Sequence, residues 1–235
     1  MASRDTSRRQ REEDIVQATR ALFDERGAQD AAVDEVAKAL GINRALVYRH
    51  FASREELYVR TVTTYLDDLA ARLREAASAH EGPVAAFRAL CEAFAAFGLE
   101  HPAFPDCALS LMRRPAAELR EVVSDGTWLR LGQSMGACLG VSANVLRAGK
   151  LQGVFAVDDP DLAANLLYAQ GLGTLHLARI GVGVREVVPG TGAPFPVSPS
   201  AVARAMVDAA LRFVSPAGGP PAGSHAAQAA AAPPS

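Results

Sequence analysis

The feature that most constrains how this chain folds is a pair of short helical patterns separated by a glycine, in residues 33–51. In the first pattern, Val33, Val36 and Leu40 recur at the i, i+3, i+7 spacing that places apolar side chains on one helix face. Gly41 follows directly and is typical of a residue that ends a helix. Two short helices joined by a glycine-containing turn form a helix-turn-helix unit, so we expect this motif here.

The second pattern, residues 44–51, divides into two faces when it is placed on a helix of 3.6 residues per turn, and Asn43 before it can cap that helix. One face can pack on the first helix and holds Leu46, Val47, His50 and Phe51. The opposite face holds Arg44, Ala45, Tyr48 and Arg49. Arginine can donate two bonds to guanine, alanine can contact a thymine methyl group, and tyrosine can donate to a phosphate. This face therefore suits a DNA major groove, and the alternative is an ordinary solvated helix surface.

Helical patterns also flank the unit. Upstream, Ile15, Ala18 and Leu22 predict a helix that begins at Glu13 and ends at Gly27. The residues before it, 1–12, are polar and arginine-rich without periodicity, and they predict a flexible arm. Downstream, a capping box predicts a long helix that begins after Ser53.

These motifs resemble the DNA-binding domain of the tetracycline-repressor (TetR) family of bacterial regulators, over residues of about 9–60. The motifs that carry the resemblance are Leu22-Phe23, Gly27, Val33-Asp34-Glu35-Val36-Ala37, Gly41-Ile42-Asn43, Val47-Tyr48-Arg49-His50-Phe51 and Ser53-Arg54-Glu55-Glu56-Leu57. The resemblance implies that Arg44, Ala45 and Leu46 approach base edges. It implies that Tyr48 and His50 contact phosphates, with Arg49 beside them and Arg54 at a helix N-terminus that favours a phosphate.

The chain departs from the family pattern at three positions. Ala32 stands where the family has a small hydroxyl residue that caps the second helix, and Asp30 is a substitute cap. Ala45 and Leu46 replace the usual glycine and threonine of the recognition helix. These departures leave the operator sequence open, but they do not alter the prediction that the domain binds DNA.

The rest of the chain predicts an all-α fold with no strand. Helices are expected over about 83–99, 106–113, 115–148 with a kink near Gly126, 161–180 and 198–213, and residues 181–197 are expected to be a Gly/Pro loop. We expect four parts: a flexible arm (1–12), a TetR-type helix-turn-helix DNA-binding domain (13–60), a helical regulatory and dimerisation domain (61–214), and a disordered low-complexity tail (215–235).

The helices 161–180 and 198–213 are the expected homodimer interface. One stripe holds Leu162, Leu166, Ala169, Gly173 and His176-Leu177, and the other holds Val202, Ala205, Met206, Ala209 and Phe213. Such stripes can also be simple core, but the resemblance implies a four-helix interface built from these helices. Gly171 and Gly173 would allow a close helix approach.

Aromatic and methionine side chains recur between the expected DNA-binding domain and the expected dimer interface. The resemblance implies that some of them line an apolar cavity for a small effector, and the alternative is that they are core. The candidates are Phe94, Phe97, Met112, Trp128, Met135 and Phe155. Because no charged residue is obviously stranded among them, we expect a neutral, largely apolar ligand.

Composition excludes several other function classes. The formal net charge is −2, so any nucleic-acid site must be a local patch. Three sparse cysteines indicate free thiols in a reducing cytoplasm, and no apolar run is long enough to cross a membrane. We expect no cofactor, and the ligand-type side chains of Glu100-His101 and Asp106-Cys107 are too irregularly spaced for a metal site. No catalytic motif is present, so we expect no enzyme and name no catalytic residue.

The sequence therefore predicts a cytoplasmic transcriptional regulator, with repression the favoured output. It would bind a palindromic double-stranded DNA operator as a homodimer and be released by a small, largely apolar ligand. Two other classes remain as alternatives, an enzyme that uses the helical cavity and a scaffold that binds protein.

Overall fold

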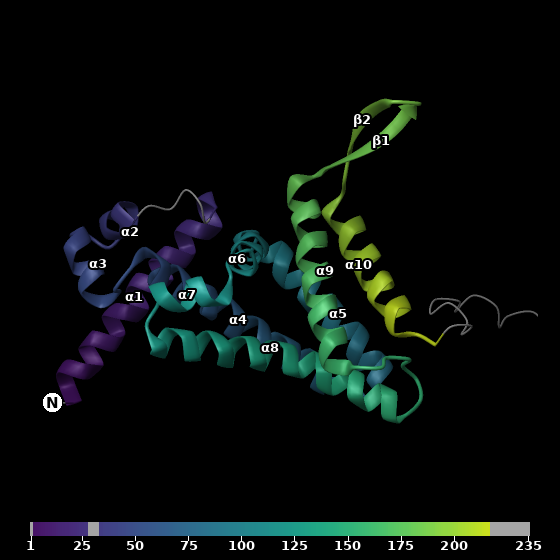
Figure 1. Cartoon of the computed structure of the whole chain (residues 1–235), viewed down its shortest axis with the longest axis horizontal. Coiled ribbons are helices and arrows are strands. Elements are labelled where there is room, and N and C mark those ends of the chain that lie inside the picture. Colours follow the sequence, from purple (N-terminus) through teal and green to yellow (C-terminus); the bar gives the residue numbers. More distant parts are fainter. Residues whose placement is uncertain (1, 28–32, 217–235) are drawn as a thin grey trace, which may run out of the picture.

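The computed structural model describes residues 2–27 and 33–216 of the 235-residue chain. Within them the molecule is built of helices with one two-stranded sheet (Figure 1). The N-terminal helices are α1 (Ala2–Arg26), α2 (Val33–Ala39), α3 (Arg44–His50) and α4 (Arg54–Ser78). They are followed by α5 (Pro83–Glu100), α6 (Ala103–Met112), α7 (Ala116–Val122), α8 (Asp125–Leu151) and α9 (Pro160–Ile180). The chain continues through β1 (Val182–Val188), β2 (Thr191–Pro196) and α10 (Pro199–Val214).

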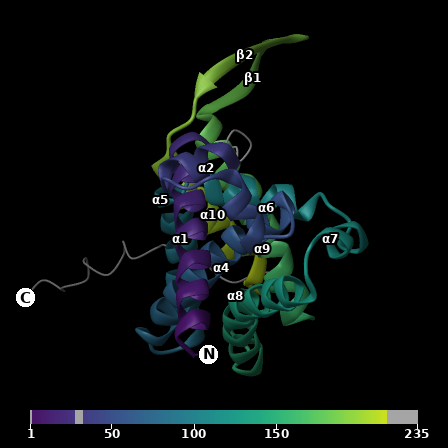
Figure 2. The same cartoon turned by 90° about the vertical axis from the view of Figure 1, so that its left-hand side faces the viewer.

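The helices α1, α2 and α3, with the start of α4, lie at one end of the molecule, and we call this part the head (Figures 1 and 2). Its small core forms where the three short apolar faces meet. Ile15, Val36 and Val47 are each at most 1% exposed there, and Phe51 is 2% exposed. The predicted packing of the second helix on the first is therefore confirmed.

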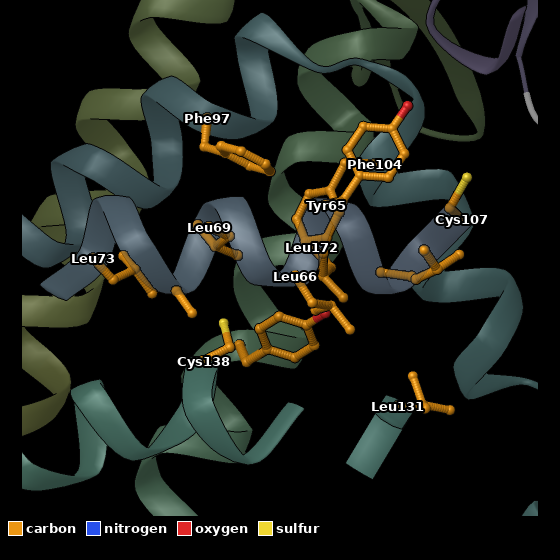
Figure 3. Packing of buried hydrophobic residues seen from close by; sticks show 14 of the residues in the cluster. Tyr65, Leu66, Leu69, Leu73, Phe97, Phe104, Cys107, Leu131, Cys138 and Leu172 are labelled. Atoms are coloured by element: carbon orange, nitrogen blue, oxygen red, sulfur yellow. The ribbon is translucent and has the colours of Figure 1, made fainter. Parts of the chain in front are cut away.

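The rest of the described chain, from the middle of α4 to α10, is called the body. Here α4 is the central helix, because it packs along both α5 and α8. Figure 3 shows its buried side chains Tyr65, Leu66 and Leu69 among residues of the neighbouring helices. Phe97 and Phe104 meet edge to face, with ring centroids 5.2 Å apart. Burial of each large apolar side chain contributes about 1.5–3 kcal/mol to folding.

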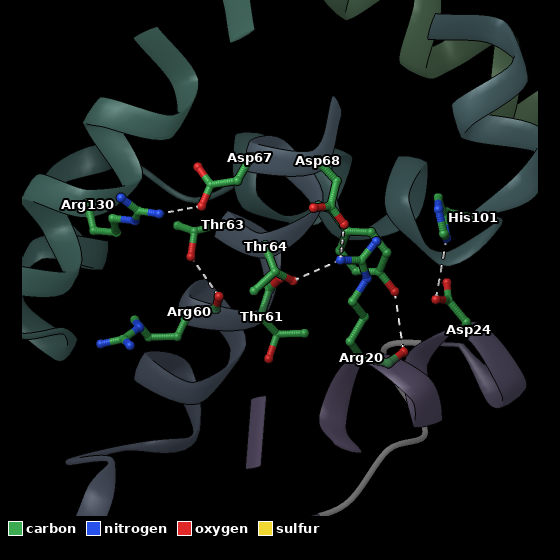
Figure 4. A network of polar contacts seen from close by, with 11 residues as sticks. Arg20, Asp24, Arg60, Thr61, Thr63, Thr64, Asp67, Asp68, His101 and Arg130 are labelled. Atoms are coloured by element: carbon green, nitrogen blue, oxygen red, sulfur yellow. Dashed lines mark hydrogen bonds and ion pairs between the residues drawn. The ribbon is translucent and has the colours of Figure 1, made fainter. Parts of the chain in front are cut away.

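Polar contacts fix α1 to the body (Figure 4). The Arg20 guanidinium binds the Asp68 carboxylate and lies 4.2 Å from the centroid of the Tyr65 ring. The Tyr65 hydroxyl in turn donates to the Arg20 carbonyl at 3.3 Å. On the next turn of α1, Asp24 lies 3.7 Å from His101 Nδ1.

Three expectations about secondary structure are wrong. The segment expected to be a flexible arm is the first part of α1, because i, i+4 pairs support a helix there, including Arg8 with Glu12 at 3.0 Å. The expected Gly/Pro loop is a β-hairpin that projects from the body (Figure 1). In this hairpin Val188 pairs with Thr191 across a turn with Gly190 at φ 79°, a conformation that suits glycine.

The third difference concerns the expected long helix over residues 115–148. The structure ends α7 at Val122 and starts α8 at Asp125, because Ser124 takes an extended conformation and its hydroxyl accepts from the Thr127 amide. The break therefore precedes the expected kink at Gly126. The boundary expected at residue 60 falls inside α4, and the expected tail lies, from residue 217, outside the described residues.

Candidate nucleic-acid interface

The recognition helix expected from the sequence is α3, and its start is capped. The Asn43 side-chain oxygen accepts from the Leu46 amide at 2.8 Å. Behind the helix, Val47 is 1% exposed. The four residues predicted on the outer face are all exposed, namely Arg44, Ala45, Tyr48 and Arg49. The structure thus presents these side chains together on one surface of the head.

Arg44 and Tyr48 interact with each other on this face. The Arg44 guanidinium lies 5.4 Å from the centroid of the Tyr48 ring, and its Nη2 lies 3.5 Å from the hydroxyl. Asp34 of α2 lies 3.3 Å from Arg44 Nη1. The pKa of Arg44 is raised above its ordinary value, first by the hydrogen bond to Tyr48 and then by the Asp34 charge. Arg44 is therefore a permanently charged donor held at the surface.

The two other α3 candidates are less accessible. Leu46 is half-buried, which suits an apolar or structural role. The His50 side chain is 14% exposed, and its Nδ1 lies 3.5 Å from Glu12 Oε1 without a hydrogen bond. The ring therefore packs against α1 and does not share the outer surface with Arg44, so its phosphate contact stays a prediction.

The last candidate, Arg54, stands at the start of α4. This N-terminus is the predicted capping box: Ser53 Oγ accepts from the Glu56 amide at 2.9 Å, and Glu56 Oε2 accepts from the Ala52 amide at 3.1 Å. Arg54 is exposed, and it also lines a cavity between the head and the body.

Further cations lie on α1. Arg8, Arg9 and Arg11 are exposed, and Arg8 pairs with Glu12. The departure at Ala32 and the substitute cap at Asp30 lie outside the described residues. A positive patch can therefore form around α3 although the chain as a whole is slightly acidic.

The six residues expected to bind an effector do not converge on one cavity. A small apolar cavity of about 60 Å³ lies between α5, α8, α9 and α10, and of the six only Phe94 lines it. Phe97 and Phe155 are buried in packing contacts, whereas Met112 is 54% exposed. Trp128 and Met135 are half-buried on α8. Drug-sized ligands occupy roughly 300–1,000 Å³, so this cavity would have to expand to hold one.

Three of the side chains considered for a metal site have another partner, namely Glu100, His101 and Asp106. Asp106 is in hydrogen-bond contact with His176 and forms an ion pair with Arg179, and Glu100 pairs with Arg72. Within the part of the chain that the structure describes, no group of three His, Cys, Asp or Glu side chains could hold a metal ion. No described helix is long and apolar enough to span a membrane.

Among residues 2–27 and 33–216, none covers the outer stripe of α9. Leu162, Leu166 and Leu177 are 56%, 50% and 40% exposed. A Cβ on Gly173 would meet nothing within 4 Å, whereas one on Gly171 would lie 2.7 Å from Phe94. Gly171 therefore serves the internal contact with α5, and Gly173 belongs to the open face. We call this face of α9, with Phe213 of α10, the candidate dimer face.

Comparison with known proteins finds a family match in the head of the molecule. The model for bacterial regulatory proteins of the tetR family matches residues 15–61, the segment that holds the capped α3 and its flanking helices. This segment therefore resembles the DNA-binding domain of the TetR family. The family model describes bacterial regulatory proteins, which agrees with the expected DNA-binding helix-turn-helix.

Individual TetR-family relatives align with part of the chain. The HTH-type transcriptional activator FasR of Mycolicibacterium smegmatis is 32% identical over 94 residues, 40% of this chain and 42% of FasR. The HTH-type transcriptional repressor KstR2 of Mycobacterium tuberculosis is 32% identical over 71 residues, 30% of this chain and 36% of KstR2. The alignments thus span about two fifths of one curated relative and about a third of the other.

Solved TetR-family structures share the whole fold. KstR2 of Mycobacterium tuberculosis superposes with a TM-score of 0.58 at 22% identity, covering 88% of this chain and 95% of KstR2. PfmR of Thermus thermophilus gives a TM-score of 0.58 at 26% identity, covering 84% of this chain and 97% of PfmR. RolR in complex with resorcinol gives a TM-score of 0.62 at 16% identity, covering 89% of this chain and 90% of RolR. The arrangement of an N-terminal helix-turn-helix before a helical body is therefore common to these proteins.

Proposed function

We propose that this protein regulates transcription by binding a palindromic operator as a homodimer, with α3 of each subunit in one of two successive major grooves. The observation that carries the proposal is the outer face of α3. Arg44, Ala45, Tyr48 and Arg49 are exposed together, while Val47 behind them is buried. Helix-turn-helix dimers read half-sites whose centres lie ~34–36 Å apart.

Dimerisation through the candidate dimer face would supply the second α3. The exposed leucines of α9 lie on one side of the helix, α10 lies beside α9 (Figure 1), and Phe213 of α10 is 46% exposed. Association that buries them removes apolar surface from water, which contributes roughly 25 cal/mol per Å². This face is distant from α3, so both functions can operate at once.

Repression remains the favoured output, and release by a small, largely apolar effector is the proposed control. A relative named as an activator and one named as a repressor both align here, so the direction depends on where the operator lies. An effector in the cavity beside Phe94 would have to separate α5 from α9. It would shift the dimer from a DNA-binding conformation to one with wrongly spaced α3 helices only as far as it binds the second conformation more tightly.

Selection from random duplexes, followed by footprinting of the selected DNA, tests the proposal. We expect two protected half-sites in inverted repeat, about one helical turn apart, with protection that weakens steeply as salt rises. A single asymmetric half-site, or protection unaffected by salt, would overturn it. A protein-binding scaffold would select no sequence at all.

A further inference from the structure

A second and larger cavity, of about 430 Å³, lies where the head meets the body. Its walls come from the end of α1, the start of α4, α6 and α9, and we call it the junction cavity. The described residues that line it include five arginines and two carboxylates, a surplus of three positive charges in a chain whose net charge is −2. The arginines are Arg26, Arg54, Arg113, Arg114 and Arg179.

The carboxylates of the junction cavity are already paired. Asp106 Oδ1 lies 2.7 Å from His176 Nδ1, and Asp106 Oδ2 lies 2.7 Å from Arg179 Nη2. Glu55 lies 3.9 Å from Arg114 Nη2. Arg26 is paired as well, with Glu25 and Glu35 from outside the cavity. The positive charge that no carboxylate of the described residues compensates therefore comes from Arg54 and Arg113.

Two of the arginines have guanidinium groups that are available to bind an anion. Within the described residues, neither Arg54 of the head nor Arg113 at the end of α6 lies within 4.0 Å of a carboxylate oxygen. Each guanidinium presents five donors in a planar fork that matches a phosphate or a carboxylate. In the wall of the cavity the Tyr58 hydroxyl donates to the Cys107 carbonyl at 2.8 Å and so joins α4 to α6.

We propose that the junction cavity binds a small organic polyanion, one that carries a phosphate or several carboxylates. The cavity volume lies within the range of small-molecule sites. Such a ligand would contact Arg54 from the head and Arg113 and Arg179 from the body, and so would join the two parts. This site is separate from the small apolar cavity beside Phe94.

A regulatory consequence rests on the proposed function. Arg54 is predicted to contact a DNA phosphate, so an anion held in the junction cavity would compete for it. The same anion would also fix the head against α6 and α9 and bias the spacing of the two α3 helices in a dimer. We therefore expect the anion to weaken operator binding, with reciprocal weakening of anion binding by DNA.

Isothermal titration of the full chain with inorganic pyrophosphate, and separately with citrate, tests the site at fixed ionic strength. We expect saturable binding of at least one probe, at one site per subunit. Binding should weaken at least tenfold in Arg113→Gln, and further in Arg179→Gln, which removes a cation and leaves Asp106 with one partner fewer. The pyrophosphate and citrate arms separate phosphate from carboxylate ligands.

Arg147→Gln is the matched control. Arg147 and Arg179 have side chains that are both 46% exposed, and Arg147 also pairs with an aspartate, Asp161, at 3.0 Å. The control should bind the probes like the wild type. No saturable binding of either probe, or equal binding by Arg113→Gln, Arg179→Gln and Arg147→Gln when their thermal melting is intact, would overturn the proposal.

The anion titration is carried out without DNA, so it tests the anion site independently of operator binding. If the anion binds with the expected variant profile but the protein selects no operator, the anion site stands and the proposed function fails. If an operator is found, saturating pyrophosphate should lower its affinity in the wild type and in Arg147→Gln, but not in Arg113→Gln. Equal loss of operator affinity in all three proteins would refute the competition for Arg54.

Discussion

Glu56 Oε1 accepts a hydrogen bond from Ser124 Oγ at 2.6 Å, which joins the start of α4 to the start of α8. The same oxygen accepts from Thr127 Oγ1 at 3.0 Å, and the Glu56 side chain is buried. Ser53, the N-cap of α4, also donates to the Val122 carbonyl at 2.8 Å. One capping box therefore both starts the helix that leaves the head and holds it on the body.

We expect Glu56→Ala to lower the free energy of unfolding by about 3 kcal/mol. Three donors would lose their acceptor, and a buried donor left unsatisfied costs roughly 1–3 kcal/mol. Urea unfolding followed by circular dichroism measures the change. Glu75→Ala, at an exposed site on the same helix, is the control and should change stability by less than about 0.5 kcal/mol. Equal effects of the two substitutions would show that the Glu56 contacts carry no net stability.

Arg44→Ala should weaken binding to the selected operator by ~1–3 kcal/mol and relax the base preference at one position in each half-site. The reason is that Arg44 is a charged donor on the exposed face of α3. Titration of labelled operator and of a scrambled duplex measures both effects. The control is Arg74→Ala, an exposed arginine at the far end of α4. A uniform loss on every sequence would instead assign Arg44 to the phosphate backbone.

Leu166→Glu should convert the wild-type dimer to a monomer of 24.7 kDa. The side chain is 50% exposed in the single chain, so the substitution should leave the fold intact while it places a charge in the candidate dimer face. Light scattering after size exclusion measures the mass. The control is Leu129→Glu on α8, where the leucine is 62% exposed. A monomeric wild type, or a dimeric Leu166→Glu, would refute this face as the interface.

Gly171→Ala and Gly173→Ala should shift the stability of the subunit in opposite directions. A Cβ at Gly171 would lie 2.7 Å from Phe94 Cε1, and such overpacking costs about 1–3 kcal/mol. A Cβ at Gly173 meets nothing within 4 Å, so alanine there should gain roughly 0.5–1 kcal/mol from helix propensity. Urea unfolding of each variant in the Leu166→Glu background removes the contribution of the dimer. Equal effects would contradict the assignment of Gly171 to the internal contact.

The pH dependence of stability should reflect the three thiols. Burial raises the pKa of Cys91, Cys107 and Cys138 to about 12, from 9.0 in the unfolded chain. The contribution of the protonated thiols to the free energy of unfolding is therefore fully present below pH 9. It is lost between pH 9 and 12, because the thiols of the unfolded chain release their protons first. Urea unfolding at pH 8 and pH 10 should show a loss of about 1 kcal/mol per thiol. In the folded protein Cys107 and Cys138 should also resist iodoacetamide at pH 8.5, and rapid alkylation of either would contradict its burial.

The sequence predicted α3 well because its determinants are local. Asn43 caps the helix, Val47 recurs with the apolar face, and Gly41 breaks the chain before it. Caps and periodicity act over a few residues, so they are visible without tertiary structure. The exposure of Leu166 could be anticipated for the same reason, because it follows from the helix period.

The hairpin and the junction cavity could not be predicted in this way. The residues of β1 and β2 are largely exposed and rich in proline and glycine, which is typical of a loop, so only their pairing identifies them as strands. The junction cavity depends on Arg54, Arg113 and Arg179, which are brought together from three separate helical regions. A contact of this kind depends on how α4, α6 and α9 pack, and no local pattern signals it.

Methylation interference on the selected operator tests the central claim most directly. Dimethyl sulfate methylates guanine N7 in the major groove and adenine N3 in the minor groove, so it reports which groove α3 occupies. We predict that N7 methylation blocks binding at guanines in both half-sites, and that Arg44→Ala removes the interference at one guanine in each. Interference at adenine N3 alone, or in a single half-site, would contradict a dimer that reads two major grooves through α3.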